Sequence, residues 1–219
     1  MRAFVRSYLD PGDRLGEVLF GLIMVLTITL TTELALEDGR AGARELLIAA
    51  IGCNVAWGII DGGMYVMGAM LERARRANAI LAVKGAPDEA TALAIVEDAL
   101  EGTLVALQPD EERRRLYRQV REMALRATPA PTRLQREDLL GGAACLLLVV
   151  LSVVPVVLPF LLIRDPWLAL RVSNALLVVL LFVTGYEWGR HANTSRWLAG
   201  LIYMAVGLVL VGVAIALGG

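Results

Sequence analysis

The sequence predicts an all-α, polytopic membrane protein with five transmembrane helices and a cytoplasmic helical insert between helices 2 and 3. Of the 219 residues, 57% are hydrophobic, the mean hydropathy is +0.63 and the formal net charge is only −1. The charged residues are clustered, and the stretches between them reach the roughly 20 apolar residues that cross a bilayer as a helix. Because backbone groups in lipid must be satisfied within the segment, these stretches are expected to be helices.

Five stretches fit this description, and each ends near a polar segment. We expect spans over residues 15–34, 46–71, 139–163, 167–188 and 197–217. The first stretch carries no cleavage-site pattern, so it is expected to remain as a helix rather than to act as a signal peptide. Trp167, Trp188 and Trp197 stand at span ends, as aromatic residues do at a membrane interface.

The expected spans divide the chain into three parts. Residues 1–71 hold an N-terminal segment and two spans, residues 72–138 form the polar insert, and residues 139–219 hold three spans. Proline followed by acidic residues is a good helix start, and such starts occur at Pro87 and Pro109. The expected elements of the insert are a continuation of span two over 72–83, a break over 84–87, a helix to about 102 and a helix from 109 to about 127.

The distribution of basic residues predicts the orientation. Only four of the 21 Lys and Arg residues fall on the side of the membrane opposite the insert, namely Arg40, Arg44, Arg164 and Arg171. Cytoplasmic loops carry an excess of Lys and Arg. We therefore expect the N-terminus and the insert to be cytoplasmic and the C-terminus to be outside.

Several classes of function are disfavoured. The chain contains no P-loop, GxSxG, HExxH or paired CxxC motif, so neither an enzyme nor a resident cofactor is expected. The near-neutral charge gives no support to a nucleic-acid partner. His191 follows span four in a basic turn and is expected to face solvent or lipid headgroups. Cys53 and Cys145 fall within spans and are expected to be packing residues rather than a disulfide.

Asp61 is the only ionisable residue in the interior of the expected spans. A carboxylate inside a membrane is costly unless it faces a cavity or a partner, so Asp61 is a candidate functional residue that could exchange a proton for a metal ion. The alternative is a neutral Asp61 that is hydrogen-bonded to a neighbouring helix.

At 100° per residue, two helix faces gather polar and small residues. The face of Asp61 also holds Asn54, Gly58, Tyr65, Gly68 and Glu72, and span one places Glu17, Gly21, Met24 and Thr31 along one stripe. These stripes could form an ion path, with candidate metal ligands Asp61, Met64, Met24, Asn54, Glu72 and Glu17. The alternative is helix packing through small residues, because Gly58-x-x-x-Gly62 is itself a packing motif.

Two further features have structural and functional readings. Pro155 and Pro159 should kink span three, and the kink could also serve as a cavity wall or gate. The insert has acidic residues that could bind cations, but arginines surround them and favour a salt-bridged, solvated surface. The acidic candidates are Glu97 with Glu101, Glu112, and Glu122 beside Met123.

The layout and two local motifs resemble the vacuolar iron transporter family. In span two, Asp61-Gly-Gly-Met-Tyr-Val-Met67 aligns with the family pattern small-small-Gly-Glu-Tyr-Val-Ser, and span three ends in Pro159-Phe-Leu-Leu162, like the family's Pro-Phe/Tyr-Leu-Leu. Gly21-Leu22 precedes the place of the family's Asn-Asp-Gly. The resemblance implies a homodimer that exports ferrous iron, and often manganese, from the cytosol in exchange for protons.

The chain also departs from the family pattern. The family's span-one Asp falls on Met24 and its span-two Glu falls on Met64, with Asp61 one turn earlier. The family's first insert helix is rich in glutamate, whereas here it reads Glu72-Arg-Ala-Arg-Arg76, which weakens an acidic storage site. We expect a proton-coupled transporter of a divalent transition metal, iron or manganese. The alternative is a non-transporting membrane scaffold or regulatory protein of the same fold.

Overall fold

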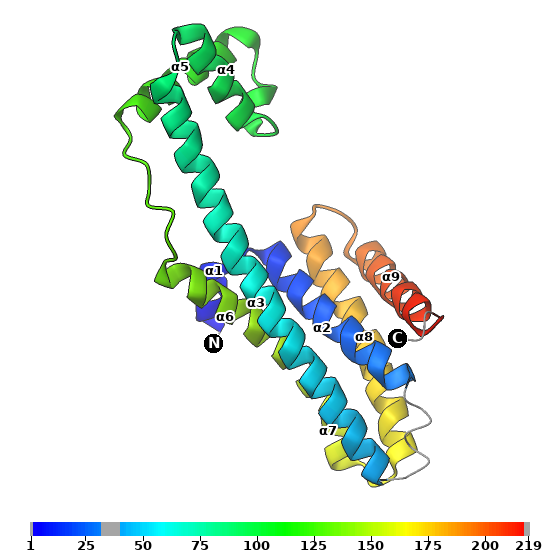
Figure 1. The fold of residues 1–219 in the computed structure, drawn as a ribbon. Helices are drawn as coiled ribbons and strands as arrows, with labels where there is room; N and C mark the ends of the chain where they lie inside the picture. Colours follow the sequence, from blue (N-terminus) through cyan, green and yellow to red (C-terminus); the bar gives the residue numbers. More distant parts are fainter. Residues whose placement is uncertain (1, 32–39, 217–219) are drawn as a thin grey trace. The chain divides into compact units, whose positions relative to one another are not determined.

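The computed structural model describes residues 2–31 and 40–216, and helices are the only regular secondary structure in this part of the chain. The all-α prediction is therefore confirmed. The elements, shown in Figure 1, are α1 (Arg2–Tyr8), α2 (Pro11–Thr31), α3 (Arg40–Gly85), α4 (Glu89–Leu100), η2 (Leu104–Leu107), α5 (Asp110–Arg126), α6 (Arg136–Ser152), α7 (Val154–Leu162), α8 (Pro166–His191) and α9 (Arg196–Ala216).

Three helical segments in the described ranges are long and apolar enough to cross a membrane. They are Ala41–Gly85, Arg136–Leu162 and Pro166–His191, of which the second combines α6 and α7. Arg196–Leu210 in α9 is a shorter apolar helix. These features are those of a membrane protein. The predicted ends of spans one and five, at residues 34 and 217, lie outside the described residues.

The chain forms two compact units. Met1–Val66 and Arg136–Gly219 make the first, which we call the helical bundle, and Met67–Gln135 makes the second, which we call the insert unit. Helix α3 contributes to both units because it runs without interruption across their boundary.

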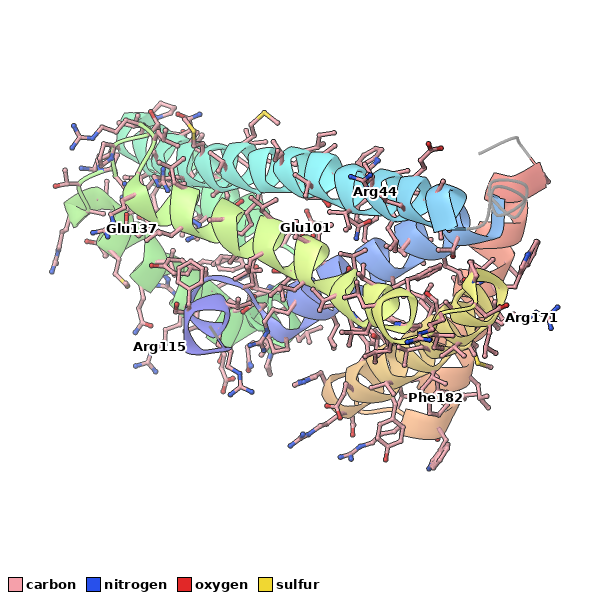
Figure 2. The ribbon with its side chains drawn as sticks, turned by 90° about the horizontal axis from the view of Figure 1, so that it is seen from below. Arg44, Glu101, Arg115, Glu137, Arg171 and Phe182 are labelled. Atoms are coloured by element: carbon pink, nitrogen blue, oxygen red, sulfur yellow. The ribbon has the colours of Figure 1, made fainter. Side chains whose placement is uncertain are left out.

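The core of the helical bundle lies between α2, α7 and α8. Branched aliphatic side chains fill it together with Ala50 of α3, namely Leu22, Val25, Leu26, Val153, Val156, Leu177 and Leu181. Helices α8 and α9 pack through small residues, since a Cβ on Gly185 would lie 2.7 Å from the carbonyl oxygen of Ala199. Phe182 of α8, labelled in Figure 2, has its ring centroid 5.6 Å from that of Trp197.

Span three is interrupted at Pro155, as predicted, whereas Pro159 lies inside α7 and does not end it. Helix α6 ends at Ser152 and α7 begins at Val154, because Pro155 has no N–H with which to continue the α-helical hydrogen bonding. The hydroxyl of Ser173 on α8 donates to the Val156 carbonyl at 3.0 Å, which ties α7 to its neighbour.

Helix α1 was not expected from the sequence. Val5 of α1 and Leu9, which directly follows the helix, are buried against Ala144 and Cys145 of α6. Seven residues are too few to give a clear helical period, so only tertiary packing identifies this segment as part of the core.

The two predicted helices of the insert are confirmed as α4 and α5. Asp88 caps α4 by accepting a hydrogen bond from the Thr91 amide at 2.8 Å, and this bond lowers the pKa of the Asp88 carboxyl. Val83, Val96 and Tyr117 are buried in the core of this unit. Arg121 pairs with Glu122 at 2.8 Å and Arg113 with Asp110 at 2.7 Å, so some of the arginines of the insert form the salt bridges that the sequence predicts.

Candidate functional site

The structure brings three of the six candidate ligands together in one pocket of the helical bundle. Glu17 of α2 and Asp61 and Met64 of α3 line a pocket of about 460 Å³. Asp13 and Tyr65 add polar groups to the same wall. The remaining lining comes from Leu9, Gly12, Gly16 and Phe20. The first turns of α2 and the turn Asp61–Tyr65 of α3 form the walls of the pocket.

The pocket concentrates negative charge. The charges of Asp61 and Asp13 both act on the half-buried Glu17 carboxylate, which also accepts a hydrogen bond from the Cys145 thiol. One carboxylate oxygen of Asp61, Oδ2, is buried and has no hydrogen-bond partner among the described residues. Like charges in such surroundings repel, so the arrangement favours a bound cation or proton that compensates them.

Asn54 has a different environment from Asp61, although the two residues share a helix face. Its side chain is fully buried, and Nδ2 donates to the carbonyl of Gly21 at 3.3 Å and to that of Val149 at 3.1 Å. It therefore connects α3 to α2 and α6 and does not line the pocket. Met24 is half-buried on α2 and is also absent from the pocket lining.

Gly58 and Gly62 of α3 are packed tightly against α6. A Cβ on Gly58 would lie 2.8 Å from Leu146 Cδ1, and one on Gly62 would lie 2.7 Å from the Gly142 carbonyl oxygen. The small residues of this part of the stripe therefore serve helix packing. The polar stripe is divided into a packed half and a half that borders the pocket.

Glu72, the last candidate ligand, belongs to the insert unit. It is exposed, and its Oε1 pairs with the Arg76 guanidinium at 2.9 Å, one turn along α3. This pair is an ordinary solvated ion pair on a helix surface.

Sequence reasoning missed two members of the site. Asp13 is not among the candidate ligands predicted from the sequence, although it lies one turn before Glu17 and so shares its face of α2. Cys145 was expected only to pack, but its buried thiol also donates a hydrogen bond to the Glu17 carboxylate. No local sequence signal marks Cys145, because its partner lies on another helix.

No three His, Cys, Asp or Glu side chains of the described ranges gather closely enough to hold a metal ion by themselves. A scan of the chain against protein-family models finds no match. A search of curated proteins likewise finds no match. The fold and the pocket thus define an all-α protein with three helical segments long and apolar enough to cross a membrane and an acidic pocket between two of its helices.

Proposed function

We propose that this protein is a membrane transporter that moves a divalent transition metal, iron or manganese, out of the cytosol in exchange for protons. The observation that carries the proposal is the pocket in which Glu17, Asp61 and Met64 meet beside Asp13. Carboxylate oxygens suit hard divalent ions, and a thioether adds a softer ligand that suits iron. The metal ion is the substrate, and waters or a second chain would complete its coordination.

The proposal includes five membrane spans, with α2 and α9 as the first and last. Each of these helices has 21 residues, enough to cross a hydrocarbon core about 30 Å thick. The basic residues orient the N-terminus and the insert to the cytoplasm. A reporter fused after Ala86 should then be active only inside the cell, and one at the C-terminus only outside.

The division of the stripe suggests how transport would proceed. In the proposed orientation, the pocket lies toward the cytoplasmic ends of α2 and of the membrane-spanning part of α3. The packing at Asn54, Gly58 and Gly21 closes the path beyond it. A transporter must seal one side while the other is open, and this packing is a candidate for the seal. Protons on Glu17 or Asp61 would replace the metal's charge on the return step.

The resemblance to the vacuolar iron transporter family supports a homodimer, in which the pore lies between two copies. Gly58 of the Asp61 stripe and the neighbouring Gly62 already pack against α6 of the same chain, so these two glycines do not form the contact between copies. An exposed apolar face of α3, with Ile48, Val55 and Ile59, is the remaining candidate on this helix.

The second candidate function is a non-transporting scaffold or regulatory protein. The packed half of the stripe favours it, because Asn54 connects three helices through backbone carbonyls and leaves no path at its level. Under this reading, the acidic pocket holds protons or water and moves no ion.

Uptake into proteoliposomes tests the proposal. The purified protein should move Fe²⁺ or Mn²⁺ down an imposed gradient, with slower movement of Co²⁺ and Zn²⁺ and an opposite flux of protons. Protein-free liposomes provide the control. If the folded and correctly inserted protein gives the same rates as that control for all four ions, transport is excluded and the scaffold function is favoured.

A further inference from the structure

We propose that a second pocket of the helical bundle binds an anionic phospholipid through its phosphate. This pocket measures about 280 Å³ and is distinct from the acidic pocket, with which it shares no lining residue. It is formed by α1, the start of α2, α6 and the end of α8. The start of α2 and the α8–α9 turn lie at the same end of the bundle (Figure 1).

The rim of the pocket is cationic. Arg6 of α1, Arg14 of α2 and His191 of α8 line it together with Glu187. Neither Arg6 nor Arg14 has a carboxylate partner within ion-pair distance among the described residues. Glu187 is 3.9 Å from Arg190, which offsets part of its charge. Two arginines without partners at a single opening favour a phosphate group, which guanidinium binds in bidentate geometry.

The wall of the pocket is apolar. Val5, Leu15, Leu148 and Leu151 contribute aliphatic side chains from three helices. Arg14 and Leu15 are consecutive, so the change from a charged rim to an apolar wall coincides with the start of the apolar part of α2. This coincidence matches an anionic headgroup attached to an acyl chain, and basic pockets between transmembrane helices bind such lipids.

The size of the pocket indicates how much of a lipid it holds. Small-molecule sites usually enclose roughly 300–1,000 Å³. A pocket of about 280 Å³ has room for a glycerol phosphate and the first methylenes, so the rest of the acyl chain would lie along the outer surface of α6. A soluble phosphate would bind the arginines but has no apolar group to pack against the apolar wall.

Native mass spectrometry of the full chain in detergent tests the proposal, with phosphatidylglycerol as the probe and phosphatidylcholine as the neutral comparison. Wild-type protein should bind phosphatidylglycerol more tightly than phosphatidylcholine. The Arg6→Gln/Arg14→Gln variant should bind phosphatidylglycerol about thirtyfold more weakly, which corresponds to about 2 kcal/mol at 1.4 kcal/mol per tenfold change. Arg6→Lys/Arg14→Lys should lose less affinity than the glutamine variant, because lysine keeps the charge but not the bidentate geometry.

A matched control is available on the insert unit. Arg115, labelled in Figure 2, and Arg118 are exposed on the polar helix α5. The Arg115→Gln/Arg118→Gln variant loses the same charge and should keep wild-type affinity. An equal loss in both variants, or no loss in the first, would overturn the proposal. Binding of inorganic phosphate alone, with no preference for the lipid, would also overturn it.

Discussion

Gly62 of α3 and Gly142 of α6 meet backbone to backbone. A Cβ built on either residue would lie 2.7 Å from the carbonyl oxygen of the other, closer than real Cβ atoms approach. The next residue, Gly63, has nothing within 4 Å of its Cβ position. The two adjacent glycines therefore have different roles, and this difference can be measured.

Gly62→Ala should destabilise the helical bundle, because the methyl group meets backbone that cannot rotate away. We expect a cost of about 1–3 kcal/mol, as for overpacked cores. Gly63→Ala should be neutral or stabilising by up to about 1 kcal/mol, since alanine favours a helix. The stabilities of both variants are measured by thermal unfolding in detergent, which is monitored through the reactivity of the buried Cys145 thiol. Equal stability of the two variants would contradict the α3–α6 contact.

Asp61→Asn should keep the fold and abolish metal transport. The amide is nearly isosteric but carries no charge to hold a cation, and loss of roughly 3 kcal/mol corresponds to about a hundredfold lower rate. Glu17→Gln should reduce transport by the same mechanism. Glu72→Gln is the control, because its carboxylate is exposed and paired with Arg76, and it should only slow access of the ion. Wild-type rates for Asp61→Asn at matched protein levels would exclude Asp61 as the coupling carboxylate.

The stability of α4 should depend on the ionisation of Asp88. Its pKa is lower in the folded protein than the ordinary value of 3.8, because the Thr91 amide donates to the carboxylate. The contribution is therefore fully present above pH 3.8 and is lost as the pH falls through the folded pKa. Hydrogen exchange at the Thr91 amide should accelerate in Asp88→Ala at neutral pH. Asp88→Ser should keep the cap and remove the acid dependence, and unchanged exchange in Asp88→Ala would refute the capping role.

A homodimer that uses the exposed face of α3 should give a specific crosslink. Ile59 is 60% exposed on this face. In the proposed dimer, a cysteine at position 59 would therefore lie close to the same cysteine of the second copy. In a Cys53→Ala/Cys145→Ser background, Ile59→Cys should crosslink in membranes. Leu201→Cys on α9, where the leucine is 50% exposed, should not. Equal crosslinking at both positions would indicate random collision in the membrane rather than a dimer.

Some parts of this molecule follow from short-range rules that can be read along the chain. Apolar stretches give the positions of the long helices, Asp88 gives the start of α4, and Pro155 gives the break between α6 and α7. The sequence also makes Asp61 a candidate functional residue, because it is the one charge within a long apolar stretch. Each of these signals involves residues within a turn or two of one another.

The tertiary structure alone decided which polar residues lie together. Asn54 and Asp61 share a helix face in sequence, yet Asn54 is buried against carbonyls of Gly21 and Val149 while Asp61 borders a pocket. Cys145 joined Glu17 from a helix more than a hundred residues away. Helical periodicity fixes the direction in which a side chain points from the helix axis. The neighbour that this side chain contacts depends on how closely the helices approach, and glycine allows a closer approach than residues with a side chain do. At Gly62 and Gly142 that approach is close enough to set the register of α3 against α6.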